Sequence, residues 1–149
     1  MRRIVWLLAG VLLVMLSVGS DSPREYSDGA TEVDELQGTW QWTGDEFNGR
    51  KVETRLQEVL TFRNANYTSK YSDGDTFRGS YRLDPTRKPP HLDEVPSNGP
   101  YQGQTVKYIY QLDRDTLRIA FMAAEDDMRR PQGFNDKGVY VETYKRVKK

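Results

Sequence analysis

The sequence contains no cysteine and a single histidine, His91, and these two shortages exclude several kinds of site. Without cysteine the chain cannot form a disulfide, a thiol nucleophile, a thiolate metal site or a lipid-modified N-terminal cysteine. Alternation places His91 and Asp93 on one face of an expected strand, where such a pair could hold a metal or move a proton. Since no second imidazole exists, we interpret His91 as a surface histidine and expect neither a metal nor another cofactor.

Net charge is also lacking, because 22 Lys and Arg residues balance 22 Asp and Glu residues. A chain of formal net charge +0 gives no general reason to expect nucleic acid or an anionic membrane as a partner. Hydrophobic residues make up only 36% and the mean hydropathy is -0.80, so the core must be thin or built from a strongly alternating pattern. The length of 149 residues suits one ordinary domain.

One long apolar run is present, at residues 4–16, directly after Arg2 and Arg3 and before the mostly small residues 17–20. This layout is typical of a signal peptide, which we place at residues 1–20 with cleavage before Asp21. We therefore expect export to the periplasm, the cell envelope or the medium, with no stable membrane insertion after leader cleavage. An uncleaved anchor is the alternative, but the run falls short of the roughly 20 apolar residues that cross a bilayer.

Residues 21–33 are polar and rich in turn formers, which predicts a flexible linker before a folded domain at 34–149. Residues 34–37 could add one helical turn. From Gly38 onward the apolar pattern has a period of two between turn signals, as in an all-β protein. The eight expected strands are 38–45, 56–63, 67–72, 76–83, 91–95, 105–112, 116–122 and 139–147. Tight turn signals between them favour an antiparallel up-and-down barrel, and a β-sandwich is the alternative.

Alternation also predicts which side chains point into the barrel. They form one aromatic-rich face, made of Trp40, Trp42, Leu56, Leu60, Phe62, Tyr67, Tyr71, Phe77, Tyr81, Leu83, Tyr108, Tyr110, Leu112, Leu117, Ile119 and Phe121. Aromatic walls with hydroxyl groups suit a small amphipathic ligand, so the candidate ligand-binding residues are Trp42, Tyr81, Tyr108, Tyr110 and Phe121. Because an eight-stranded barrel is just wide enough for its own side chains and these aromatics are large, we favour the alternative that they mostly fill the interior.

Gly38-Thr39-Trp40 opens the first expected strand and resembles the Gly-x-Trp signature of the lipocalin superfamily. In that family an arginine near the end of the last strand packs across the Trp, and Arg146 stands at the matching place. The resemblance implies a lipocalin-like eight-stranded barrel closed at one end by a Trp40–Arg146 pair, a contact worth about 1–2 kcal/mol.

A broader resemblance is to an uncharacterised family of small exported proteins common in planctomycete bacteria. It is carried by residues 35–40, 79–89, 99–105, 109–113 and 115–117, by Arg130-Pro131 with Phe134, and by Lys145-Arg146. Two positions depart from that pattern: Ala120 replaces a frequent cysteine, and Arg114 replaces a turn glycine. Because arginine resists positive φ, we expect a looser turn at Arg114.

No set of residues in the sequence predicts catalysis. Asp113 and Asp115 sit on an expected hairpin tip rather than in a cleft, and no Ser/His/Asp spacing or phosphate-binding glycine loop is recognisable. Asp73-Gly74-Asp75 and residues 125–127 offer oxygen ligands, but a hairpin turn and a solvated loop explain them better. The sequence therefore favours a non-enzymatic, exported binder of a small hydrophobic or amphipathic molecule. A protein-interaction module of the cell envelope, with another envelope protein as partner, is the alternative.

Overall fold

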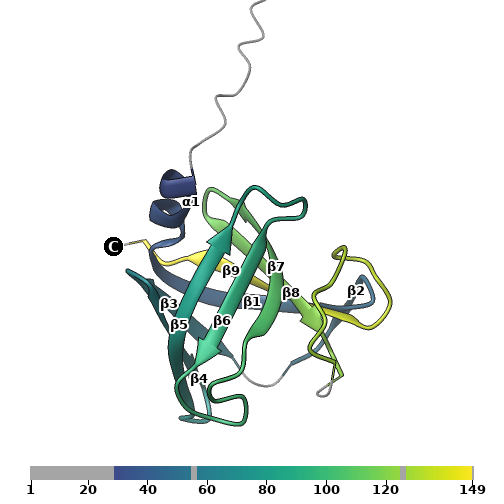
Figure 1. Cartoon of the computed structure of the whole chain (residues 1–149). Helices are drawn as coiled ribbons and strands as arrows, with labels where there is room; N and C mark the ends of the chain where they lie inside the picture. Colours follow the sequence, from purple (N-terminus) through teal and green to yellow (C-terminus); the bar gives the residue numbers. More distant parts are fainter. Residues whose placement is uncertain (1–28, 55–56, 125–126, 149) are drawn as a thin grey trace, which may run out of the picture.

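The structure is a computed structural model that describes residues 29–54, 57–124 and 127–148, and it is almost entirely β (Figure 1). The expected signal peptide and residues 21–28 of the expected linker lie outside the described residues. The elements are α1 (Gly29–Leu36), β1 (Gly38–Phe47), β2 (Arg50–Val52), β3 (Glu58–Arg63), β4 (Asn66–Tyr71), β5 (Thr76–Asp84), β6 (His91–Pro96), β7 (Val106–Asp113), β8 (Thr116–Met122) and β9 (Val139–Arg146).

Eight of these strands close into the predicted antiparallel up-and-down barrel. The hydrogen-bonded order runs β1-β3-β4-β5-β6-β7-β8-β9, and β9 pairs back with β1, so the sheet has no open edge around the barrel. In this closing pair Trp40 lies opposite Arg146 and Trp42 opposite Tyr144, with a register shift between Trp42 and Gly44. The closure excludes the sandwich alternative.

The turns follow the expected chemistry with one exception. Asn48 and Gly49, at φ of 51° and 71°, join β1 to β2, as a two-residue hairpin turn requires. The expectation of a looser turn at Arg114 was wrong, because Arg114 adopts a φ of 50° in a tight turn between Asp113 and Thr116. Arg146 explains this, since its guanidinium donates to the Arg114 carbonyl and forms an ion pair with Asp115.

Strand β2 was not predicted from the sequence, and α1 was predicted only in part, as a turn at residues 34–37. Residues 29–33, assigned to the flexible linker, belong to α1, which lies across one end of the barrel in Figure 1. The buried Leu36 and the indole N–H of Trp40, which donates to the Leu36 carbonyl at 2.9 Å, fix this helix to the barrel. The short strand β2 pairs with the end of β1 outside the barrel, and all three of its residues are exposed.

The predicted inward face forms the core. Trp40, Leu60, Phe62, Tyr67, Tyr81, Tyr110, Leu117 and Ile119 belong to one buried cluster, against which Trp42, Leu83, Tyr108 and Leu112 pack. Tyr71, Phe77 and Phe121 line the interior cavity described below, and Leu56 lies outside the described residues.

A second, smaller cluster lies on the outer face of β7, β8 and β9. It consists of Ile109, Ala120, Val139 and Val141, against which Met122 and Phe134 pack. Phe134 comes from the long connection between β8 and β9. Arg130 fastens the same connection to the wall, because its guanidinium donates to the Leu92 and Tyr108 carbonyls and pairs with Asp93.

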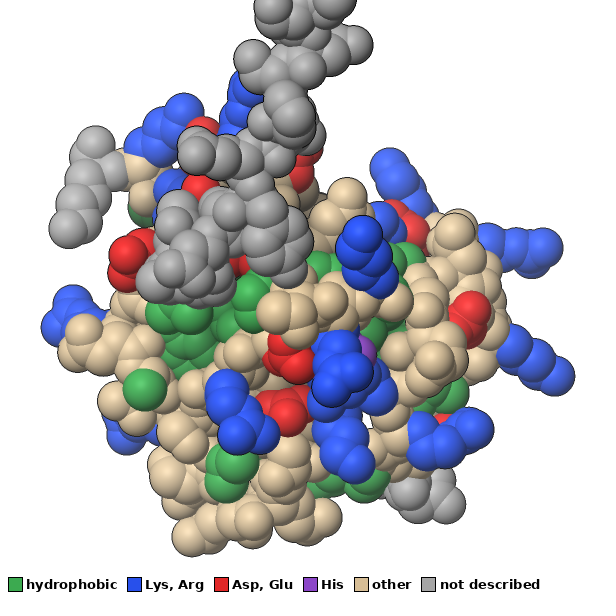
Figure 2. All heavy atoms as spheres, turned by 45° about the horizontal axis from the view of Figure 1, so that its top comes forward, with side chains coloured by type: hydrophobic (Ala, Val, Ile, Leu, Met, Phe, Trp, Pro, Cys, Tyr) green, Lys and Arg blue, Asp and Glu red, His purple; other side chains and the backbone are tan. Residues whose placement is uncertain are grey.

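Of the residues described, none forms a helix with the length and hydrophobicity needed to cross a bilayer. On the face shown in Figure 2, Lys and Arg side chains project outward with Asp and Glu side chains among them. This face therefore mixes charges of both signs.

Candidate functional site

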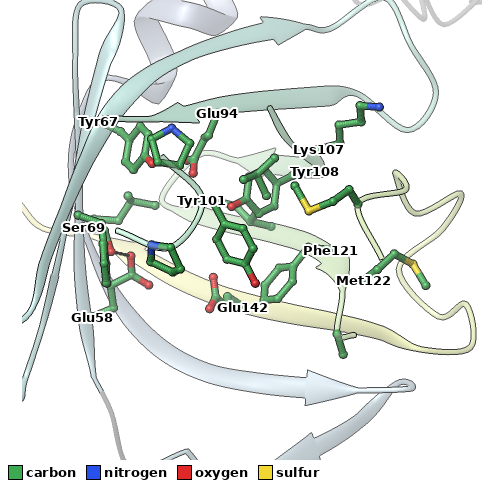
Figure 3. Close-up of a pocket in the computed structure, with 18 of the residues that line it drawn as sticks. Glu58, Tyr67, Ser69, Glu94, Tyr101, Lys107, Tyr108, Phe121, Met122 and Glu142 are labelled. Carbon is green, nitrogen blue, oxygen red and sulfur yellow. Dashed lines mark hydrogen bonds between the residues drawn. The ribbon is translucent and has the colours of Figure 1, made fainter. Parts of the chain in front are cut away.

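The barrel contains a cavity of about 360 Å³ at the end opposite α1 (Figure 3). Its walls come from most of β4, the starts of β3, β5 and β7, the middle and second half of β9, and the ends of β6 and β8. Residues 98, 100, 101, 123, 124 and 127–129, from the connections that follow β6 and β8, also contribute to its lining. This volume falls within the range of roughly 300–1,000 Å³ found for small-molecule pockets. The interior is therefore not completely filled by its own side chains.

Aromatic side chains make up much of the cavity wall. Tyr71 and Phe77 meet edge to face with ring centroids 5.8 Å apart, and Tyr108 and Phe121 do the same at 5.8 Å. Tyr101 reaches into the cavity from the connection between β6 and β7 (Figure 3). Edge-to-face contacts favour defined orientations of the four paired rings.

Two glutamates on this wall share one tyrosine. The Tyr144 hydroxyl lies 2.6 Å from Glu58 Oε2 and 2.8 Å from Glu142 Oε2, and Ser69 also donates to Glu58. A phenol has one proton to donate, so it can serve only one of two ionised carboxylates. The second contact forms when that carboxyl is protonated and donates to the phenol oxygen. Burial raises the pKa of both carboxyls, and the charge of Glu58 raises that of Glu142 further. Raised pKa values agree with a proton retained by one of the pair.

A third glutamate faces the cavity from β6. Glu94 is only 8% exposed, and Figure 3 shows its carboxyl directed inward. Burial, and secondarily the negative charge of Glu58, raises the pKa of Glu94 to about 8, while a hydrogen bond with Tyr108 opposes this shift. Glu94 is therefore largely protonated at neutral pH when the cavity is empty.

The described residues supply no cation to these three carboxyls. None of the ion pairs among residues 29–54, 57–124 and 127–148 includes Glu58, Glu94 or Glu142. Lys107 and Arg129 do lie at the cavity lining. However, Lys107 points away from the glutamates in Figure 3, and Arg129 is bound to Asp127 at 2.7 and 2.8 Å. The polar part of the interior is thus acidic.

The carboxyls do not form a metal centre. Within the part of the chain that the structure describes, no three Asp, Glu or His side chains are grouped closely enough to hold a metal ion. Asp93, the partner considered for His91, instead pairs with Arg130 and, at 3.8 Å, with Arg82. Burial and the charge of Arg130 lower the pKa of His91.

The structure separates the five candidate ligand-binding residues. Tyr108 and Phe121 line the cavity. Trp42 packs at the side of the core and donates to Asp45 at 2.6 Å. Tyr81 lies at the closed end and donates to the Asn64 carbonyl, and Tyr110 is buried in the core with a hydrogen bond to Glu32 of α1.

The acidic residues were missed, although a signal for them was present. Glu58 is two residues before the inward Leu60, Glu94 two after the buried Leu92, and Glu142 two before Tyr144. The same alternation that selected the aromatic residues therefore places these glutamates inside. Alternation alone is weak evidence for an inward glutamate, because charged residues are seldom fully buried.

At the closed end the structure brings Trp40 and Arg146 together. The Arg146 guanidinium carbon lies 4.2 Å from the centroid of the Trp40 ring. The same guanidinium donates to the Gln37 carbonyl at 2.8 Å and to the Glu35 carbonyl. These bonds satisfy carbonyl groups at and just beyond the end of α1, and the arginine thereby ties the helix to the last strand.

No protein-family model, no curated protein and no solved structure matches this chain. The resemblances to lipocalins and to the planctomycete family therefore remain predictions, and the evidence for function is the geometry of the cavity.

Proposed function

We propose that this protein is an exported, non-enzymatic binding protein that takes up a small amphipathic molecule in the barrel cavity. The observation that supports this most directly is the cavity itself, about 360 Å³ in volume, with aromatic walls and a few polar groups. Pockets of this kind bury most of a small ligand and use the polar groups to orient it. An envelope interaction module would need no such cavity, so the alternative receives less support.

The test is a thermal-shift and native mass spectrometry screen of the purified domain against a broad set of small amphipathic molecules. A ligand that binds only the folded state raises its melting temperature by mass action. We expect several compounds to do so and to remain bound as 1:1 complexes.

Two tryptophan variants locate the binding. Val106 lines the cavity near its mouth, so Val106→Trp should obstruct the cavity and abolish the shifts. Val95 is 37% exposed and does not line the cavity, so Val95→Trp should keep them. If no compound stabilises the wild type, or if Val106→Trp retains every shift, the proposed function is wrong.

A further inference from the structure

The lining of the cavity bears on the charge of its ligand as well as on its size. From its geometry we infer that the ligand is a monocation: a protonated amine, amidine or guanidine carried on an apolar or aromatic body. This inference rests on the proposed function and names the chemical class that the same cavity would take.

The first support is the arrangement of the carboxyls around the cavity. Glu58 and Glu142 meet at the Tyr144 hydroxyl, and Glu94 lies across the cavity from them (Figure 3). A group placed between the two walls therefore has carboxyl groups on both sides. An ammonium or guanidinium presents several N–H donors, which matches a set of acceptors facing it from more than one direction.

Glu94 is the clearest single case. It is more than nine-tenths buried and points into the cavity, and no Lys or Arg among the described residues pairs with it. The Tyr108 hydroxyl occupies one acceptor position. A carboxylate offers about four such positions, so Glu94 keeps free capacity directed at the cavity.

The second support is the aromatic lining. Tyr67, Tyr101, Tyr108 and Phe121 line the same space as the glutamates. Ring faces attract cations within about 6 Å, and the attraction strengthens when water is excluded. Leu60 and Ile119 complete the wall and suit an apolar body. Both the carboxyls and the aromatic faces favour a positively charged ligand. An anionic ligand would be repelled by the carboxylates and would not be attracted by the ring faces.

A purely structural role explains the glutamates less well. Burying a carboxyl without a cationic partner costs free energy, and an apolar residue of similar volume would avoid that cost. Three such residues facing one cavity repeat the cost three times. The cost is offset if a ligand supplies the missing positive charge.

Binding of a cation beside Glu94 should release a proton, because Glu94 holds one in the empty cavity and its ionised form pairs with the ligand. The ligand enters as an ammonium, a carboxyl proton leaves for the solvent, and no covalent bond within the ligand changes. The titratable and charged groups around these carboxyls are Asp45 from β1, Tyr67 and Tyr71 from β4, Tyr108 from β7, Asp127 and Arg129 at the mouth, and Tyr140 and Tyr144 from β9, together with Lys107 of β7, whose ammonium points away from them. Burial raises the pKa of these tyrosines, so near neutral pH the released protons come from the glutamates.

The experiment uses probes that share a body and differ in charge. Phenylethyl, hexyl and indolylethyl bodies are each tested as the amine, the alcohol and the carboxylate, by isothermal titration calorimetry at pH 6, 7 and 8. We expect the amines to bind at least about tenfold more tightly than the matching alcohols, and the carboxylates to bind most weakly. Repeating the titration in buffers of different ionisation enthalpy should show release of about one proton per amine bound near pH 7.

Matched variants assign the effect to the cavity. Glu94→Gln keeps the size of the side chain and removes its charge, so amine affinity should fall at least about tenfold while alcohol affinity stays the same. Glu53 is exposed and lies outside the cavity, so Glu53→Gln should change neither.

The outcomes separate the two proposals. If alcohols bind as tightly as amines and Val106→Trp abolishes both, the cavity is a binding site and the inferred charge is wrong. Tighter binding of the carboxylates would also overturn the inferred charge. If no probe of any charge binds and the broad screen also fails, the proposed function falls with it.

Discussion

Substituting Glu94 by glutamine should make the protein more stable at neutral pH, although the substitution removes a native side chain. In the folded protein the pKa of Glu94 is raised from 4.5 to about 8, chiefly by burial. Between those two pH values the folded state holds a proton that the unfolded state has lost. The free energy of unfolding therefore falls as pH rises through this window, and it stops falling above about pH 8.

The size of the effect follows from the same shift. Each pH unit inside the window costs about 1.4 kcal/mol, so from pH 5 to pH 7 the wild type should lose about 3 kcal/mol through this one group. Glutamine is neutral throughout and resembles the protonated acid in shape. The Glu94→Gln variant should therefore match the wild type near pH 5 and exceed its free energy of unfolding by about 3 kcal/mol at pH 7.

The assay is urea unfolding followed by tryptophan fluorescence at pH 5, 6, 7 and 8, since Trp40 is fully buried in the folded barrel. Glu58 and Glu142 remain in both proteins, so the difference between the two curves reports Glu94 together with its smaller charge interactions with these two glutamates. In the control Glu53→Gln, at an exposed position, the free energy of unfolding should change with pH as it does in the wild type. If Glu94→Gln also runs parallel to it between pH 5 and 8, Glu94 is not held protonated and the reasoning about the interior is refuted.

Two further variants test the barrel itself. Arg146→Ala should lower the free energy of unfolding by about 2–4 kcal/mol, because it removes the contact with Trp40 and leaves backbone carbonyls unpaired. The control Lys145→Ala, at an exposed position, should have little effect. Equal losses for the two variants in urea titrations would contradict the role of Arg146. Gly79→Ala should lower the free energy of unfolding by more than about 3 kcal/mol or prevent folding, because the new Cβ would overlap the backbone of β6. In the control Gly44→Ala the new Cβ meets no atom within 4 Å, so the free energy of unfolding should change by no more than about 1 kcal/mol. Near-equal melting temperatures for the two variants would show that β5 and β6 can move apart to accommodate the methyl group.

The barrel could be predicted from the sequence because each strand alternates and each tight turn carries its own signal. Strand 116–122 was predicted with the bounds that the structure shows. Each of the other predicted strands differs from its observed counterpart by one or two residues at its ends. Strand β2 was missed because Arg50, Lys51 and Val52 face solvent on both sides and leave no alternation to detect. Most of α1 was missed because its polar sequence gives little indication of a helix, and contacts of Leu36 at the barrel end stabilise it.

The site could be predicted only in part. Alternation tells inside from outside, but it does not tell how far along the barrel axis a side chain lies. Tyr108 and Tyr81 both point inward, yet Tyr108 lines the cavity and Tyr81 lies at the closed end. Glu94 follows the same alternation, and its importance appears only when the closed sheet shows that no cation from the described residues pairs with it.

The pairing of β1 with β9 has a consequence for how the chain reaches this fold. Arg146 contacts carbonyl groups 109 and 111 positions earlier, so the barrel cannot close until the final strand has been synthesised. Until then the nascent sheet has exposed edges on β1 and β8, which are templates for pairing with other chains. We expect a chain cut before β9 to aggregate during synthesis, and a chaperone that shields unpaired edges to matter most during that interval.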